Sequence, residues 1–214
     1  MATKIALKDQ VYITLKKKII NNEYPSNSYI EEKDVCQEFN VSRTPVREAM
    51  ARLERENFVI LVPQKGARVR EMTLQATVDI FKIRKTIEPL LVTMACKESN
   101  FDSVYLLGLK EQFRENVKLK DFDKLHQLDH EFHQYLFQQS RNPHLVTIMS
   151  YISDQFQRVR TQSFNAEQRT LEGAMQHLAI IDAILTQEYD TLQKLLLQHI
   201  MTNEEHFLRG LLNN

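Results

Sequence analysis

One amphipathic segment of the chain carries two side chains whose types and spacing suit metal binding. At about 100° per residue, Leu128, Phe132 and Leu136 form a single apolar face of a helix. Asp129 falls on this face, and His133 lies beside it one turn later. Because a buried carboxylate without a partner is costly, a cation is expected to neutralise Asp129. An Asp-x-x-x-His pair on one helix is well spaced to bind a single cation.

Two later segments supply further inward-facing histidines. His177 lies at the edge of one apolar stripe, and His199 falls within another. With the first pair they would place three imidazoles and one carboxylate, from three helices, in the core of a bundle. A single core histidine is usually only hydrogen-bonded, however, and His206 also faces inward, while His126 and His130 lie near the boundary of the apolar face. Periodicity by itself therefore leaves the choice of ligands open.

A set of imidazole and carboxylate donors suits several divalent metal ions. Zn²⁺, Ni²⁺, Mn²⁺ and Fe²⁺ all accept such ligands, and the residues do not rank them. We take zinc as the first expectation. Four protein ligands would leave positions open on a five- or six-coordinate ion, and the carboxylate of a small-molecule effector could fill them.

A second group of chemically informative residues lies near the other end of the chain. Ser42, Arg43, Thr44 and Arg47 stand at the start of an expected helix, where a DNA-recognition helix contacts bases. Arginine can pair with two atoms of guanine, and hydroxyl groups and first-turn N–H groups suit phosphates. Arg43 and Arg47 are four residues apart and so project from the same side. The alternative is an ordinary amphipathic helix with surface arginines.

The elements around these residues predict a winged helix-turn-helix. Three helical segments are followed by a β-branched run and an alternating run, which indicate a β-hairpin. Lys65 and Gly66, at the expected hairpin tip, fit a wing that lies on the DNA backbone or in the minor groove. The helices are expected at residues 8–21, 31–39 and about 43–57, and the strands at 58–62 and 67–70.

All later segments have helical periodicity, so the fold class is mainly α, with a C-terminal antiparallel bundle of six to seven helices. Residues 1–71 and 72–214 are the expected domains. The helices are expected at residues 73–98, 102–118, 121–140, 143–162, 166–187 and 190–212, with breaks at 99–100, 119–120, 142–143 and near 165.

Composition agrees with a mostly helical protein whose two parts differ in charge. The 214 residues include 4 Gly, 5 Pro and no Trp, too few turn residues for a β-sandwich or barrel. The net charge is zero, but residues 1–70 hold 13 Lys and Arg against 9 Asp and Glu, a net charge of +4. Residues 71–214 hold 15 against 19, a net charge of −4, together with all 7 histidines. This asymmetry favours two domains with different partners.

Other features of the sequence favour a cytoplasmic protein with no membrane partner. No apolar run approaches the roughly 20 residues that span a bilayer, and the first residues lack the apolar core of a signal peptide. Cys36 and Cys96 lie far apart without CxxC spacing, so a disulfide or a cysteine-based zinc site is not expected.

The basic end resembles the DNA-binding domain of GntR-family bacterial transcription regulators. The resemblance rests on the string Ser-Arg-Thr-Pro-Val-Arg-Glu-Ala at 42–49, followed by Arg52-Leu53 and by Pro-Gln-Lys-Gly at 63–66. It implies that Arg43, Thr44 and Arg47 contact the operator, with Gly66 in the wing. Lys33 stands where many members have a DNA-contacting arginine. The sequence departs from the family at Pro25-Ser26, usually Pro-Gly, and at 57–59, usually Gly-Leu-Val.

The acidic end resembles the FadR-type C-terminal domain, FCD, of the same family. Three segments carry the resemblance in order, at 129–133, 177–184 and 198–199. It implies that the metal ligands are Asp129, His133, His177 and His199. Arg84 matches the family arginine expected to face the effector, and an Arg–carboxylate contact suits an organic acid. The alternative for Arg84 is a surface salt bridge with Glu88, four residues later.

These features together predict a ligand-responsive DNA-binding regulator rather than an enzyme. The resemblance implies a homodimer on a pseudo-palindromic double-stranded operator, a small organic-acid effector, and most often a repressor. One alternative is a regulator whose metal site is purely structural. The other is a helical-bundle metalloenzyme in which the metal activates water, but no general base stands out for that reaction.

Overall fold

The computed structural model describes residues 6–98, 101–161 and 166–212. It divides the chain into two compact units, and each is considered separately below. The first comprises Met1–Leu74 with Gln157–Gln162, and the second comprises Gln75–Phe156 with Ser163–Asn214. Two of the expected helix breaks, at 99–100 and near 165, lie outside the described residues.

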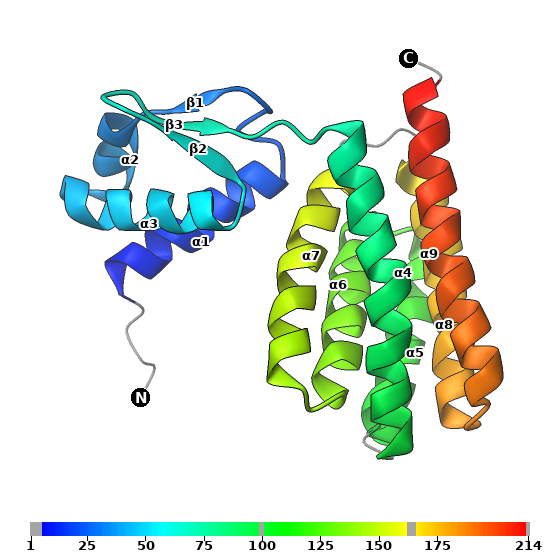
Figure 1. Ribbon diagram of the computed structural model, residues 1–214. Helices are drawn as coiled ribbons and strands as arrows, with labels where there is room; N and C mark the ends of the chain where they lie inside the picture. The colour runs from blue at the N-terminus through cyan, green and yellow to red at the C-terminus, as the bar shows by residue number, and fades with distance from the viewer. Residues whose placement is uncertain (1–5, 99–100, 162–165, 213–214) are drawn as a thin grey trace. The chain divides into compact units, whose positions relative to one another are not determined.

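The first unit contains the three helices and the hairpin that the sequence predicts, and one further strand (Figure 1). The strands form an antiparallel sheet of order β1-β3-β2, in which β1 pairs with β3 through Tyr29 opposite Arg68. The strand β1 has only two residues, too few for a period to be visible in the sequence. The bounds are α1 Leu7–Ile20, β1 Tyr29–Ile30, α2 Glu32–Phe39, α3 Arg43–Arg55, β2 Val59–Val62 and β3 Gly66–Val69.

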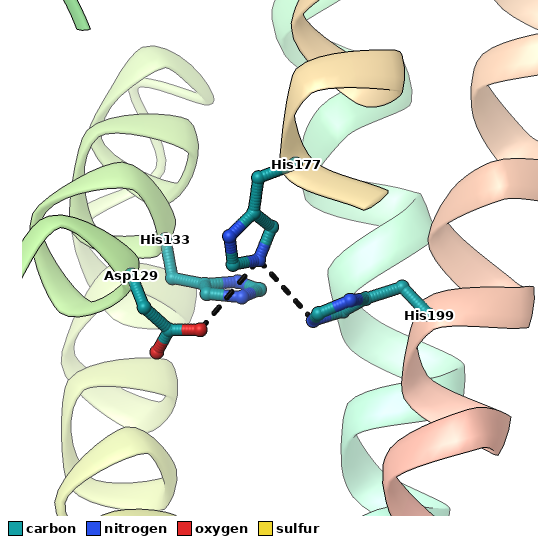
Figure 2. Close-up of side chains that lie close together, drawn as sticks. All are labelled: Asp129, His133, His177 and His199. Atoms are coloured by element: carbon teal, nitrogen blue, oxygen red, sulfur yellow. Dashed lines mark hydrogen bonds and ion pairs between the residues drawn. The ribbon is translucent and has the colours of Figure 1, made fainter. Parts of the chain in front are cut away.

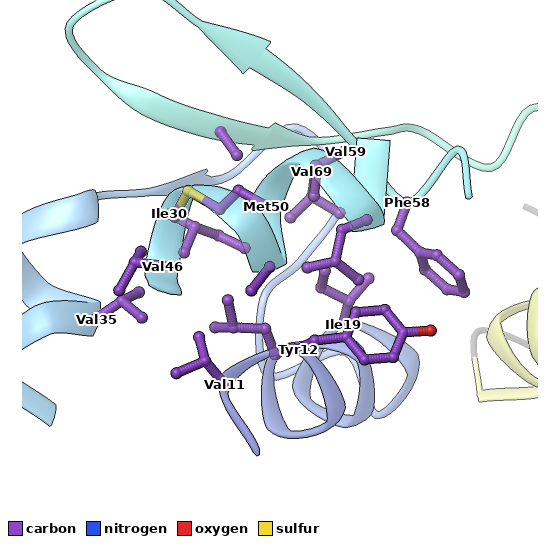
Figure 3. Close-up of a cluster of buried hydrophobic side chains, with 14 of the residues drawn as sticks. Val11, Tyr12, Ile19, Ile30, Val35, Val46, Met50, Phe58, Val59 and Val69 are labelled. Carbon is purple, nitrogen blue, oxygen red and sulfur yellow. The ribbon is translucent and has the colours of Figure 1, made fainter. Parts of the chain in front are cut away.

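An apolar core holds the helices of this unit against the sheet (Figure 3). Leu15 of α1, Leu53 of α3 and Phe58 before β2 have no solvent exposure. Burial of each such side chain contributes about 1.5–3 kcal/mol to stability. The cluster therefore holds α3 in a defined position within this unit. The remaining labelled members come from all the elements of the unit: Val11, Tyr12, Ile19, Ile30, Val35, Val46, Met50, Val59 and Val69.

The turn between α2 and α3 sets the start of the expected recognition helix. Asn40 adopts the left-handed conformation, with φ 50° and ψ 51°, as its residue type allows. The backbone N–H of Val41 then donates to the carbonyl of Cys36 at 3.0 Å. Ser42 occupies the N-cap position, but its hydroxyl makes no capping hydrogen bond, and Thr44 lies inside the helix. No side-chain hydrogen bond from Ser42 therefore caps this helix end.

The second unit is built of helices that run side by side (Figure 1). Asp102 and Asp121 cap α5 and α6 by accepting hydrogen bonds from first-turn N–H groups. The mainly α fold with a C-terminal helical domain is thus confirmed. The first residue of α4 and the last residues of α7, from Gln157, are assigned to the first unit. The bounds are α4 Leu74–Lys97, α5 Ser103–Leu119, α6 Phe122–Gln139, α7 Pro143–Thr161, α8 Ala166–Leu185 and α9 Tyr189–Leu212.

Apolar faces of these helices meet in the centre of the second unit. Leu125, Leu128, Phe132 and Leu136 are all buried, as the periodicity of α6 predicts. The helix α4 continues through Pro89, which lacks the N–H that a helix interior normally uses. Within the described residues, no helix has an apolar stretch long enough to cross a membrane.

Candidate metal centre and nucleic-acid interface

Four predicted ligands converge in the core of the helical unit. Asp129 and His133 project from α6, His177 from α8 and His199 from α9, and their side chains face a common centre (Figure 2). One possible ligand atom from each residue lies within 4.8 Å of the others. The three histidines are at most 5% exposed, whereas the side chain of Asp129 is 20% exposed. The helices α8 and α9 pack directly on each other, which places the two later histidines together.

The separations within this cluster fit a metal ion. Nε2 of His177 lies 3.3 Å from Nε2 of His199 and 3.6 Å from Oδ1 of Asp129. Ligand atoms about 2.0–2.1 Å from a tetrahedral zinc ion are separated by roughly 3.3 Å. Nε2 of His133 is buried and has no hydrogen-bond partner among the described residues. A buried nitrogen of this kind is costly unless it binds something, so the donor set fits a divalent ion.

A second layer of side chains orients the imidazole of His199. Its Nδ1 lies 2.8 Å from the amide oxygen of Gln176, which accepts a hydrogen bond. This contact places the proton on Nδ1 and the lone pair on Nε2, the nitrogen that faces the cluster. The amide of Asn203 also lies 3.2 Å from Nε2. Sequence analysis missed Gln176, although it directly precedes a predicted ligand.

The pKa of His199 is held well below its ordinary value. Burial is the main cause, and the charges of His177, His133 and Arg84 act in the same direction. The imidazole is therefore neutral near pH 7 and has a lone pair available. Neutral imidazole is the form of histidine that binds metals.

Arg84 is buried beside this cluster instead of lying at the surface. It is 3% exposed, and its Nε donates to Oε1 of Glu88 one turn later. The expected pairing with Glu88 is therefore present, but the alternative of a surface salt bridge is wrong, because this face of α4 packs into the bundle. The guanidinium carbon lies 3.9 Å from the ring centre of Phe156. Nη1 of Arg84 is buried and has no hydrogen-bond partner in the described part of the chain.

Glu88 is a further residue at this site that sequence analysis named only as the partner of Arg84. It is 1% exposed, and its Oε2 lies 3.3 Å from Nδ1 of His133. Burial raises the pKa of Glu88, but the charges of Arg84 and His133 outweigh burial and hold the pKa at about 2. The residue is therefore an anion near pH 7. Its helical spacing from Phe81 and Leu91, both buried, was the signal that could have placed it inside.

The three rival histidines lie outside the cluster. His206 pairs with Glu172 at 2.8 Å and its side chain is 32% exposed. His126 lies 2.7 Å from the hydroxyl of Thr170. His130 borders a shallow surface pocket lined mainly by glutamine and tyrosine side chains. The packing of α6, α8 and α9 therefore determines which of the candidate residues converge, a choice that helical periodicity left open.

Four of the basic residues of the first unit, together with Gly66, line one concave surface. Lys33 of α2, Arg43 and Arg47 of α3, and Lys65 and Gly66 of the hairpin all line it. Ser42 and Thr44 are exposed at the start of α3 but do not line this surface. This surface joins the N-terminal end of α3, the expected recognition helix, to the hairpin.

Two structural details of this surface are invisible in the sequence pattern. Glu31 and Glu32 also line this surface, and Glu32 accepts hydrogen bonds from Nε of Arg47 at 2.9 and 3.0 Å. Gly66 has φ +97°, and an added Cβ would lie 2.3 Å from the carbonyl oxygen of Ile30. A side chain there would clash with the backbone, so the fold of the wing requires glycine.

The class of protein follows from comparison with known families. Residues 7–69 match the bacterial regulatory proteins of the gntR family, and residues 79–202 match the FCD domain. The chain belongs to the GntR family of bacterial regulatory proteins that carry an FCD domain. It is a DNA-binding transcriptional regulator, and the family is one of regulators rather than enzymes.

Individual relatives share nearly the whole length of the chain. The uncharacterised regulator YdhC of Bacillus subtilis is 26% identical over 201 residues, which cover 92% of this chain and 89% of YdhC. The transcriptional repressor RspR of Escherichia coli is 27% identical over 197 residues, covering 92% of this chain and 86% of RspR. The structure of McbR/YncC of E. coli shares the fold, with a TM-score of 0.82 at 18% identity, over 96% of this chain and 99% of that one.

Proposed function

We propose that this protein is a metal-containing transcriptional repressor whose affinity for its operator changes when a small organic acid binds. The observation that carries the proposal is the convergence of Asp129, His133, His177 and His199 within 4.8 Å, next to the buried Arg84. The repressor RspR, which is similar over most of this chain, supports the direction of control. We place the protein in the bacterial cytoplasm, where operator DNA lies.

The DNA-binding half of the proposal concerns the basic surface of the first unit. Arg43 and Arg47 would contact base edges, and Ser42 and Thr44 would contact phosphates. Lys33 and Lys65 would contact the backbone, with Gly66 allowing the wing to form. A homodimer would present two such surfaces to a pseudo-palindromic operator, because a two-fold protein matches a two-fold site.

The sensing half concerns the second unit. A divalent ion, zinc being favoured, would attract the carboxylate of an organic acid. Arg84 would donate to the same carboxylate through Nη1, the buried nitrogen that lacks a hydrogen-bond partner among the described residues. If the acid binds one arrangement of the helices more tightly than another, it shifts the population of DNA-binding dimers.

Metal analysis of the purified full-length chain tests the ligand assignment. We expect about one ion per chain in the wild-type protein and in His206→Ala, whose histidine lies outside the cluster. His133→Ala and His177→Ala each remove one imidazole and are expected to lose most of the metal on dialysis. A strong chelator should also lower the thermal midpoint of the wild-type protein, because bound metal stabilises the folded state. Unchanged metal content in both alanine variants would refute the site.

Mobility shift with DNA from upstream of the protein's own gene tests the sensing assignment. A panel of small carboxylic acids is added to the wild-type protein and to Arg84→Lys, which keeps the charge but loses the two-pronged geometry. At least one acid is expected to weaken operator binding of the wild-type protein, with a weaker effect on the variant. If the metal is present but no acid changes DNA affinity, the metal site is purely structural and the sensor assignment is wrong.

A further inference from the structure

A buried carboxylate on α4 lies between the two groups that the proposed function treats separately. Oε1 of Glu88 accepts from Nε of Arg84, and Oε2 of the same side chain lies 3.3 Å from Nδ1 of His133. The side chains of all three residues are at most 6% exposed, so water does not screen these contacts. One anion thus touches both the proposed effector-binding arginine and a proposed metal ligand.

The contact with His133 determines which of its nitrogens can bind a metal. A carboxylate beside Nδ1 favours a proton on that nitrogen and leaves the lone pair on Nε2. Both ring nitrogens of His133 are buried without a hydrogen bond among the described residues, and Nδ1 is the one that lies beside the carboxylate of Glu88. Metal-binding histidines commonly donate their other N–H to a carboxylate, which fixes the ring and makes it a better ligand. His199 has only a neutral amide, that of Gln176, in the corresponding place.

The contact with Arg84 determines which donors remain for an incoming acid. Glu88 occupies Nε, and the ring of Phe156 lies 3.9 Å from the guanidinium carbon. These two contacts hold the plane of the guanidinium, while Nη1 has no hydrogen-bond partner among the described residues. A fixed arginine with a vacant donor loses less conformational freedom when it binds a carboxylate than a mobile one does.

We infer that Glu88 is the positioning residue of the sensing site, orienting Nε2 of His133 toward the metal and fixing Arg84 for the acid. The inference rests on the proposed metal site. Glu88 contacts both His133 and Arg84, so a change in its position is expected to alter metal affinity and acid affinity together.

Zinc affinity of the full-length protein tests the inference. Affinity is measured by competition with a chromogenic chelator for the wild type, Glu88→Gln and Glu204→Gln. Glu204 is the matched control, because it pairs at 2.6 Å with Lys85, the neighbour of Arg84 on α4, and is not one of the four converging residues. Glu88→Gln keeps the size of the side chain and removes its charge. We expect it to bind zinc about 10- to 100-fold more weakly, with Glu204→Gln within about twofold of the wild type.

A wild-type measurement covers the case in which Glu88→Gln does not fold. Long-range nitrogen NMR of the zinc-loaded protein reports which nitrogen of each histidine carries the proton. His133 is expected to carry it on Nδ1 and to bind zinc through Nε2. Glu88→Gln leaves the buried charge of Arg84 without its partner, which can prevent folding. In that case zinc affinity is measured on the double variant Arg84→Met with Glu88→Gln, in which both charges of the pair are removed.

The outcomes separate the two proposals. If wild-type protein does not bind zinc or another divalent ion, the proposed metal site itself fails. If the wild type binds zinc but Glu88→Gln binds it within twofold, or His133 binds through Nδ1, the metal site stands and the role of Glu88 is refuted. A loss of thermal stability in Glu88→Gln without a loss of zinc affinity would show a purely structural ion pair, and would also refute it.

Discussion

Two side chains at the start of α3 are proposed to recognise the DNA sequence by contacting base edges. Arg43 and Arg47 are exposed and line the same concave surface as Lys33 of α2 and Lys65 of the wing. Glu32 already accepts from Nε of Arg47, which leaves the two terminal nitrogens for a guanine edge. Because both side chains are exposed, their replacement is expected to change DNA affinity without changing the stability of the fold.

Replacement of either arginine therefore tests the proposed base contacts. We expect Arg43→Ala and Arg47→Ala each to weaken specific operator binding by about 1–3 kcal/mol per site, because a paired contact with a base is lost. Fluorescence anisotropy with the upstream DNA measures the change, and circular dichroism checks the fold. Arg55→Ala is the control, since Arg55 lies at the opposite end of the same helix. Normal binding by both variants would contradict the recognition-helix assignment.

At the scale of elements, the packing of α1 on α3 holds the recognition helix in place. Besides its apolar core, this contact contains a polar group in which Tyr12 donates to Glu56 at 2.7 Å and Lys16 donates to Glu56 at 2.9 Å. The guanidinium of Arg52 lies 3.7 Å from the ring centre of Tyr12. Burial raises the pKa of Glu56, but the hydrogen bonds from Tyr12 and Lys16 outweigh burial and lower it.

The lowered pKa of Glu56 predicts a pH dependence for the stability of the first unit. A carboxyl group with a depressed folded-state pKa stabilises the fold above its ordinary pKa of 4.5 and loses this contribution as the pH falls below that value. We expect Glu56→Gln to lower the free energy of unfolding by about 1 kcal/mol at pH 7, and the difference from wild type to shrink below about pH 4.5.

Urea denaturation followed through amide signals of α3 measures this difference at each pH. The control is Glu48→Gln, because Glu48 pairs with Lys8 at a site where both side chains are more than half exposed. Such exposed pairs contribute little, so its effect at pH 7 should be small. A difference between Glu56→Gln and wild type that is constant from pH 7 to pH 3 would contradict the explanation.

At the scale of the whole molecule, opposite charges are distributed between the two ends of the chain. Residues 1–70 have a net charge of +4 and residues 71–214 a net charge of −4. Contacts with phosphates supply most of the affinity for DNA of any sequence. A DNA-binding unit with so small an excess of positive charge is therefore expected to bind non-specific DNA weakly. Specificity is therefore expected to come from a few base contacts made twice, once by each protomer of a dimer.

The small excess of positive charge predicts both a moderate salt dependence of DNA binding and a requirement for a symmetric DNA site. If each head makes about two to four phosphate contacts, the logarithm of affinity should fall against the logarithm of salt with a slope between about −4 and −7. A palindromic site should bind far more tightly than a single half-site. Anisotropy titrations at several salt concentrations, with ultracentrifugation to count protomers per site, measure both. One protomer bound per site, with equal affinity for half-sites, would contradict the dimer.

Local sequence patterns were sufficient to predict most of the helices, the hairpin and the residue types available for chemistry. Helical periodicity placed Asp129 and His133 on or beside a buried face, and the residues from Ser42 to Arg47 marked the start of α3. These features are local: each depends on residues a few positions apart, whose preferences for helix, turn or burial do not require the rest of the chain. The two-residue strand β1 was not predicted, because it is too short to show a sequence pattern and is defined by its pairing with β3.

Which of the candidate residues meet depends on how the helices pack. Seven histidines share one part of the chain, but packing of α6, α8 and α9 brings three of them together and leaves His206 paired with Glu172 near the surface. The same packing buried Arg84 and placed Glu88 between it and His133. A helix period gives the direction of a side chain but not its depth or its partner on another helix. Those depend on how the helices pack, and so on contacts between residues far apart in the sequence.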